Sequence, residues 1–196
     1  MPVPRLILAS TSRYRRELLQ RLRLPFEVLA PGVDETPRAG ETPAALAMRL
    51  ALSKANAVAA GADDAIVIGS DQVAELDGRA IGKPGSHERA FEQLKRMSGR
   101  RVVFHTAVAV VRRDRSFERA LLAPVAVVFR HLSSDEIERY LRLDAPYDCA
   151  GSAKSEALGV ALLNSIDSDD PTALIGLPLI RTCALLREAG LDPLGA

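Results

Sequence analysis

Apolar runs alternate with helical patterns over the first half of the chain. Short runs at 6–9 and 26–29 predict two strands, and 65–71 predicts a third. The third begins Ala-Ile-Val-Ile, without polar alternation, which is typical of a strand buried on both faces. Gly69 and Ser70 indicate that it ends at Asp71. The segments between the runs predict helices over 13–24 and 43–60.

The second half contains two long β-rich runs, 101–112 and 118–130, on either side of a polar turn. The other signals predict a hairpin at Asp77-Gly78, a helix over 86–99, a helix from a Ser133–Glu136 capping box, a strand over 159–163, and a helical segment over 171–189 broken at 176–178. The pattern predicts one α/β domain over 1–196, with a mixed, elongated sheet flanked by helices. The long strands suggest a second lobe and a cleft between the two lobes.

Composition narrows the function classes. The 196 residues are 47% hydrophobic, and 26 Lys and Arg against 25 Asp and Glu give a formal charge of +1. This balance argues against a general nucleic-acid binder but allows a small anionic ligand. Only Cys149 and Cys183 are present, no leader pattern opens the chain, and no apolar run reaches the ~18 residues of a membrane span. We therefore expect a reduced cytoplasmic protein without membrane or stable nucleic-acid partners.

Asp71 is the first candidate for chemistry, because open α/β sheets keep their ligand crevice at strand ends. On position alone, an Asp that only bonds a turn is about as common. Glu35, with Asp34 as the lesser candidate, stands in a polar loop and is the second carboxylate. Mg²⁺ usually takes one or two protein carboxylates plus substrate phosphates. Asp71 and Glu35 could thus bind metal or accept a proton, or Glu35 could merely stabilise its loop.

Candidate anion-binding groups follow the first strand. Ser10, Thr11 and Ser12 are possible helix N-caps, and the first helical turn carries arginines, including Arg15 and Arg16, where acids are normally preferred. Free N–H groups, hydroxyls and guanidinium groups together suit phosphate oxygens. The alternative is a solvated basic helix end.

Two lysines could complete a phosphate site. Lys83 stands between Gly82 and Pro84 just after the predicted hairpin, where glycine lets a ligand approach the backbone. Lys54 lies within the helix over 43–60, and it could instead extend along the surface with its charge in water.

These motifs, in this order, resemble the Maf family of nucleotide pyrophosphatases. The matching pieces are Leu8–Ser12, Val33–Thr36, Lys54, Gly69–Gln72, Gly82–Pro84, Cys149–Ser152, Asp170-Pro171 and Gly176–Leu179. The resemblance implies an α/β fold with a cleft, related to inosine triphosphate pyrophosphatases. It implies hydrolysis of nucleoside triphosphates to monophosphate and pyrophosphate with a divalent cation, Mg²⁺ or Mn²⁺, and a possible homodimer. It also implies a catalytic Asp71, a motif Glu35, and phosphate binding by Ser10, Arg15, Lys54 and Lys83.

The residues at three positions are similar to those of the subfamily that prefers 7-methyl-GTP: Tyr14, Gln72 and Glu156. N7-methylated guanine is cationic, and Tyr14 could offer it an aromatic face. Glu156 could accept hydrogen bonds from guanine N1–H and the 2-amino group, and it would meet a carbonyl in thymine. The alternatives are a packing aromatic for Tyr14 and an exposed loop acid for Glu156.

The leading hypothesis is therefore an enzyme that converts 7-methyl-GTP to 7-methyl-GMP and pyrophosphate. A broader house-cleaning pyrophosphatase acting on other non-standard or pyrimidine triphosphates, such as dTTP or UTP, would share the mechanism. A non-catalytic nucleotide- or RNA-binding regulator of cell division is the alternative from another class.

Overall fold

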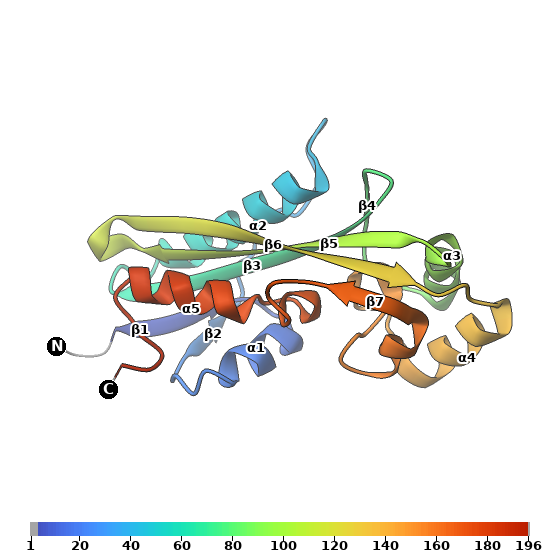
Figure 1. Cartoon of the computed structure of the whole chain (residues 1–196). Coiled ribbons are helices and arrows are strands. Elements are labelled where there is room, and N and C mark those ends of the chain that lie inside the picture. Colours follow the sequence, from blue (N-terminus) through green and yellow to red (C-terminus); the bar gives the residue numbers. More distant parts are fainter. Residues whose placement is uncertain (1–3, 196) are drawn as a thin grey trace.

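A seven-stranded mixed sheet forms the centre of the computed structural model, which describes residues 4–195 (Figure 1). Its strands are β1 (Arg5–Ala9), β2 (Glu27–Leu29), β3 (Ala65–Leu76), β4 (Arg79–Ile81), β5 (Arg101–Arg112), β6 (Phe117–Phe129) and β7 (Leu163–Asp167). The strand order is β2-β1-β3-β5-β6-β7, and β4 also pairs with β3. The β2-β1-β3 pairs are parallel and the others antiparallel, so the predicted mixed α/β fold is confirmed.

Helices cover both faces of the sheet and its far end. They are α1 (Arg13–Gln20), α2 (Pro43–Ala59), α3 (His87–Met97), α4 (Ser134–Asp144) and α5 (Leu179–Glu188), with short 3-10 turns η1 (Arg113–Arg115), η2 (Ala150–Ser152), η3 (Leu158–Leu162) and η4 (Ala173–Ile175). Alternate residues of β1 and β3 pack against α2 on one face and against α1 and α5 on the other. The distal parts of β3, β5 and β6 pack against α3 and α4 (Figure 1). No helix within residues 4–195 is long and apolar enough to cross a membrane.

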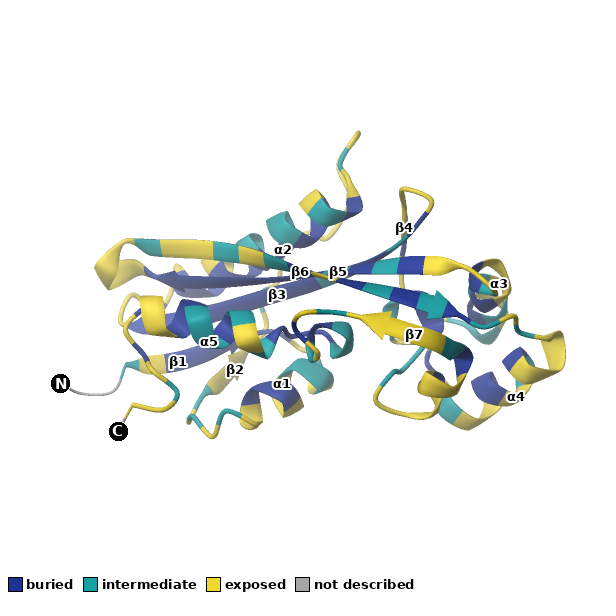
Figure 2. Cartoon of the chain, viewed as in Figure 1, coloured by how far each residue is buried: buried dark blue, intermediate teal, exposed yellow. Residues whose placement is uncertain are grey.

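Burial explains the uninterrupted apolar run of β3. Residues 65–71 of this strand are all buried, because helices cover both faces of the sheet there. Figure 2 shows β3 and β5 buried along most of their length, whereas β7 at the sheet edge is largely exposed.

The predicted end of the third strand at Asp71 is wrong. β3 continues to Leu76, because antiparallel β5 pairs with it from Ile66 to Glu75. What ends is its parallel neighbour: β1 stops at Ala9, opposite Gly69, and β4 pairs only from Ala74 onwards. Within the described chain, residues 70–73 of β3 therefore face an opening between β1 and β4.

Gly69 allows close helix packing and does not end the strand. A Cβ atom at this position would lie 2.2 Å from the carbonyl oxygen of Ala51 and 2.6 Å from the amide nitrogen of Ala55. Both atoms belong to the backbone of α2, so only glycine lets this helix approach β3 so closely. This approach holds the turn of α2 that carries Lys54 within hydrogen-bond distance of Asp71 in β3.

Local signals predicted most other elements correctly. The hairpin at Asp77-Gly78 is confirmed, with positive φ values of 54° and 74°, and so is the Ser133–Glu136 capping box. The predicted strand over 159–163 is wrong: η3 occupies this segment and β7 follows it. The first helix is shorter than predicted and ends at Gln20.

Candidate active site

One pocket of about 730 Å³ opens beside residues 70–73 of β3. Most of the candidate residues from the sequence line it, among them Ser10, Tyr14, Arg15, Glu35, Lys54, Asp71, Gln72, Lys83 and Glu156, whereas Asp34 and Arg16 do not. They come from the β1–α1 loop, α1, the loop before α2, α2, β3, the segment after β4, and the segment between η2 and η3. The fold thus gathers residues that are up to 146 positions apart in the chain, from Ser10 to Glu156.

A buried lysine joins two carboxylates at one side of the pocket. The Nζ atom of Lys54 lies 2.7 Å from Asp71 Oδ1 and 2.6 Å from Glu35 Oε1. Lys54 is only 4% exposed, because it lies among the buried and otherwise apolar residues of α2 that face the sheet. A buried ammonium group needs such partners, so the alternative of a solvated surface lysine is excluded.

Burial and cations act in opposite directions on Glu35. Burial favours its neutral form, but the hydrogen bond from Lys54 and the charges of Lys54, Lys83 and Arg15 together lower its pKa below the usual 4.5. Glu35 is thus ionised at neutral pH, which maintains the pair of carboxylates around Lys54.

Arg15 enters the pocket from the first turn of α1. Ser12 is the N-cap, and its hydroxyl accepts from the amide of Arg15, while Ser10 Oγ accepts from the amide of Ser12 at 3.0 Å. The Nε atom of Arg15 donates to the carbonyl oxygen of Gly176 at 2.9 Å, which leaves other guanidinium N–H groups for a ligand. Burial lowers the pKa of Arg15, and the charges of Asp71 and Glu35 oppose this effect.

Arg16 is not brought into the site. It is exposed and lies outside the set of residues that line the pocket. Successive side chains of an α-helix are rotated by ~100°, so Arg15 and Arg16 point in different directions. The phosphate-binding role predicted for Arg16 therefore has no support in the geometry.

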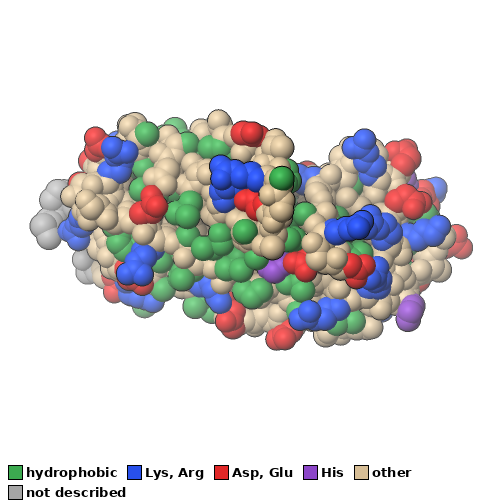
Figure 3. Space-filling view, turned by 90° about the horizontal axis from the view of Figure 1, so that it is seen from above, with side chains coloured by type: hydrophobic (Ala, Val, Ile, Leu, Met, Phe, Trp, Pro, Cys, Tyr) green, Lys and Arg blue, Asp and Glu red, His purple; other side chains and the backbone are tan. Residues whose placement is uncertain are grey.

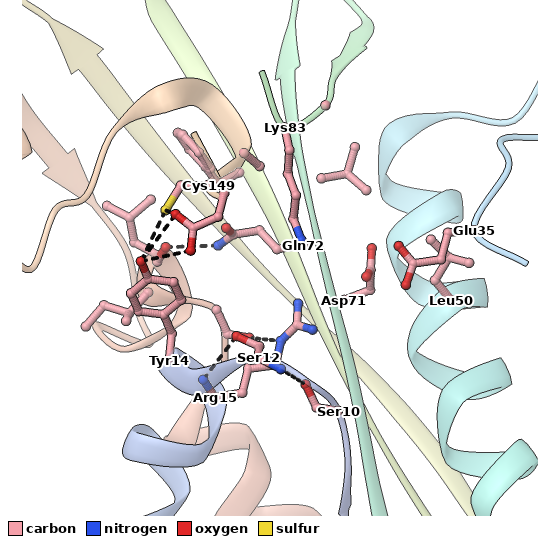
Figure 4. A pocket seen from close by; sticks show the side chains of 18 of the residues that line it. Ser10, Ser12, Tyr14, Arg15, Glu35, Leu50, Asp71, Gln72, Lys83 and Cys149 are labelled. Atoms are coloured by element: carbon pink, nitrogen blue, oxygen red, sulfur yellow. Dashed lines mark hydrogen bonds between the residues drawn. The ribbon is translucent and has the colours of Figure 1, made fainter. Parts of the chain in front are cut away.

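Tyr14 and Cys149 lie at the opposite side of the pocket (Figure 4), and Asp148 also lines the pocket. The Tyr14 hydroxyl lies 3.2 Å from Asp148 Oδ2, and Arg13 donates to the same hydroxyl at 2.7 Å. The Cζ atom of Arg13 lies 4.7 Å from the centre of the Tyr14 ring. Burial raises the pKa of Tyr14 to about 12, so the phenol stays protonated at neutral pH.

Gln72 links β3 to the C-terminal segment. Its Nε2 atom lies 2.9 Å from Thr106 Oγ1 and 3.0 Å from the carbonyl oxygens of both Ala173 and Leu174. The amide N–H groups are thus used within the protein, and only the Oε1 atom can accept from a ligand. These bonds also fix η4 just before Gly176, whose carbonyl holds Arg15.

The sequence did not single out Asp148 or Gly176 as side-chain or backbone groups of the site. Asp148 directly precedes the Cys149–Ser152 motif, and Gly176 opens a Gly-Leu-Pro motif, so each adjoins a signal that was noticed. Their contribution depends on contacts across more than a hundred residues, which no local pattern encodes.

The carboxylates of the pocket suit a divalent cation only when substrate phosphates supply further ligands to that cation. No group of three or more His, Cys, Asp or Glu side chains within residues 4–195 could hold a metal ion. Asp71 and Glu35 offer two carboxylates, each with one oxygen bonded to Lys54. This is the ligand number that Mg²⁺ takes when substrate phosphates and water complete its coordination shell.

Fold and pocket together define a mixed α/β protein with a ligand site that is strongly charged at one side and carries an aromatic ring at the other. Comparison with known proteins gives the family: the chain belongs to the Maf-like proteins, whose family model matches residues 5–189.

Several curated relatives share most of this sequence. A protein of Albidiferax ferrireducens named 7-methyl-GTP pyrophosphatase is 64% identical over 100% of this chain and 98% of its own. Proteins of the same name are 66% identical in a Polaromonas species, covering 94% of this chain and 84% of their own, and 59% identical in Bordetella pertussis, covering 97% and 95%.

Two solved structures overlap the fold in part. The Ham1 protein of Staphylococcus aureus is 19% identical, with a TM-score of 0.46, and covers 64% of this chain and 71% of its own. A dITP/XTP pyrophosphatase of Mycobacterium abscessus is 17% identical, with a TM-score of 0.43, over 65% and 75%.

Proposed function

We propose that this protein is a nucleoside triphosphate pyrophosphatase that cleaves the α–β phosphate bond of 7-methyl-GTP, which yields 7-methyl-GMP and pyrophosphate. The names of its near full-length relatives support this activity. The observation that carries the proposal is the division of one pocket into two sides. Figure 4 places Asp71 and Glu35 at one side, Tyr14 and Cys149 at the other, and Arg15 and Lys83 between them.

The charged side suits a triphosphate. Arg15 and Lys83 would bind phosphate oxygens, and the Ser10 hydroxyl and the N-terminus of α1 would add hydrogen-bond donors. Lys54 is already bonded to Asp71 and Glu35. The positive charges of the cationic side chains at this side therefore nearly cancel the negative charges of the two carboxylates. A triphosphate carries several negative charges, and this near balance supports a requirement for further positive charge.

A divalent cation, Mg²⁺ or Mn²⁺, would supply that charge, and Asp71 and Glu35 are the residues that would hold it together with the phosphates. The carboxylate of Asp71 would also accept the proton of the attacking water, since it is held in place by Lys54. Arg15 and Lys83 would hold the triphosphate so that its α–β bond lies next to the Asp71 carboxylate.

The other side suits a purine base. Tyr14 offers a ring for stacking and attraction to a cationic base. Glu156 is exposed at the pocket wall and would accept from guanine N1–H and the 2-amino group. Gln72 would contribute only its Oε1 acceptor.

We further propose that the pocket lies between two lobes, one built around α1, α2 and α5 and the other around α3 and α4. The separate apolar clusters at the two ends of the long strands support this division. The thiols of Cys149 and Cys183 are both free, which suits a reducing, cytoplasmic environment.

The test is product analysis with purified protein, Mg²⁺, and a panel of 7-methyl-GTP, GTP, dTTP, UTP and ITP. We expect pyrophosphate to be released fastest from 7-methyl-GTP, and no turnover by Asp71→Asn although that variant keeps its fold. Glu156→Gln is expected to lower the preference for guanine over pyrimidine nucleotides, because an amide can turn its N–H toward a carbonyl. Fastest release from dTTP or UTP would contradict the proposed base preference.

A second outcome would contradict the enzyme itself. Tight nucleotide binding without metal-dependent turnover would indicate a binding regulator. The face shown in Figure 3 offers an RNA no basic band, since acidic and basic side chains are interspersed on it.

A further inference from the structure

A planar cation of the protein itself already occupies the aromatic side of the pocket. The guanidinium carbon of Arg13 lies 4.7 Å from the ring centre of Tyr14. Arg13 also lies 4.0 Å from a carboxylate oxygen of Asp148, and that carboxylate lies 3.2 Å from the Tyr14 hydroxyl. All three residues line the pocket.

We infer that Tyr14 and Asp148 form a cation-binding cage, that Arg13 is its internal occupant, and that Asp148 is a specificity residue that selects a positively charged base. This inference rests on the proposed function, because it concerns the base of the same substrate. An aromatic face beside a carboxylate binds a planar delocalised cation through both groups. The guanidinium group and N7-methylated guanine share that chemistry.

The cage explains a discrimination that Glu156 cannot make by hydrogen bonding. Guanine and N7-methylguanine present the same N1–H and 2-amino groups, so a carboxylate that accepts from this edge bonds to both. The two bases differ in a methyl group and in charge. A carboxylate beside the aromatic face distinguishes them, because only the charged base gains from it.

Competition with Arg13 weakens the binding of any base without changing the discrimination between bases. A base must displace the guanidinium to reach the ring face that it covers. A cationic base recovers the lost attraction to Tyr14 and Asp148, whereas a neutral base recovers only the stacking contact. Arg13 should therefore weaken binding of neutral bases and cationic bases alike, and Asp148 should favour the cationic base alone.

Equilibrium binding in an inactive background separates this inference from the proposed activity. Calorimetry with Asp71→Asn would measure the ratio of Kd for GTP to Kd for 7-methyl-GTP, with Mg²⁺ present. Adding Asp148→Asn keeps a hydrogen-bond acceptor for Tyr14 but removes the charge, and we expect the ratio to fall about fivefold. Adding Arg13→Gln should tighten binding of both nucleotides by about twofold or more.

Matched controls change the same charges elsewhere. Asp63→Asn and Arg21→Gln alter exposed side chains that do not line the pocket, so Asp63→Asn should leave the ratio unchanged and Arg21→Gln should leave both Kd values unchanged. An unchanged ratio in the Asp148 variant, or an equal fall in the Asp63 variant, would overturn the cage. Absence of any preference in the Asp71→Asn background would overturn it as well. Absence of turnover by the wild type would instead overturn the proposed activity, since the binding ratio does not depend on hydrolysis.

Discussion

Replacing Lys54 with Met tests whether the carboxylate cluster is held by a buried charge. Methionine preserves most of the side-chain volume and removes the ammonium group. Asp71, whose side chain is 10% exposed, would lose the partner that lies 2.7 Å away. Glu35 would lose its partner too, but its side chain is 59% exposed and water can replace the lysine.

The magnitude follows from this difference in exposure. Removing one partner of a buried ion pair costs about 3–5 kcal/mol, whereas an exposed pair contributes about 0–1 kcal/mol. Arg15 lies near Asp71 and would compensate in part. We therefore expect Lys54→Met to lower the free energy of unfolding by about 2–3 kcal/mol, which corresponds to a fall in Tm of about 6–10 °C for a domain of this size.

Urea unfolding of the wild type, Lys54→Met, Asp71→Asn and the double variant would test this value. The double variant should be more stable than the sum of the single effects by at least about 1 kcal/mol, because it leaves neither charge alone in the interior. If Lys54→Met unfolds within about 0.5 kcal/mol of the wild type at neutral pH, or if the effects simply add, the buried-pair argument is refuted.

The pH dependence of the free energy of unfolding tests the same ion pair independently. The pKa of Glu35 is lowered in the folded protein, so its pairing adds stability above its unfolded value of 4.5 and loses it as the pH falls through the folded value. Lys54→Met lacks this contribution. The difference in stability between wild type and variant should therefore narrow below pH 4.5, and a difference that widens there would contradict the ion pair.

Three further outcomes are expected. Gly69→Ala should lower the free energy of unfolding by about 3 kcal/mol or more, because its Cβ atom would lie 2.2 Å from the Ala51 carbonyl oxygen; stability near that of the wild type would show that α2 can shift. Arg15→Gln should raise the KM for nucleotide by about tenfold and Arg16→Gln by less than about twofold, and equal effects would return Arg16 to the site. The phenol of Tyr14 should ionise only near pH 12, which absorbance titration of the wild type and Tyr14→Phe would check, and ionisation near pH 10.0 would contradict it. Because the unfolded phenol ionises near pH 10.0, the stability of the wild type should fall as the pH rises above that value, and Tyr14→Phe should lack this fall.

Local sequence signals determined most of the secondary structure and the composition of the site. The strand predicted over 101–112 matches β5, and the capping box and the Asp77-Gly78 turn lie where their patterns placed them. These features depend on a few neighbouring residues, so the chain encodes them without reference to the rest of the fold. The family resemblance that the ordered motifs suggested likewise named nine residues that line one pocket.

Tertiary structure decided what those residues do for one another. The continuation of β3 past Asp71 depends on pairing with β5, and the burial of Lys54 depends on how closely α2 approaches Gly69. The orientation of Arg15 depends on the carbonyl of Gly176, and the contact of Tyr14 with Asp148 joins residues 134 positions apart. Strand pairing, helix approach and charge pairing across such separations arise only when the chain is folded, because no window of sequence contains both partners.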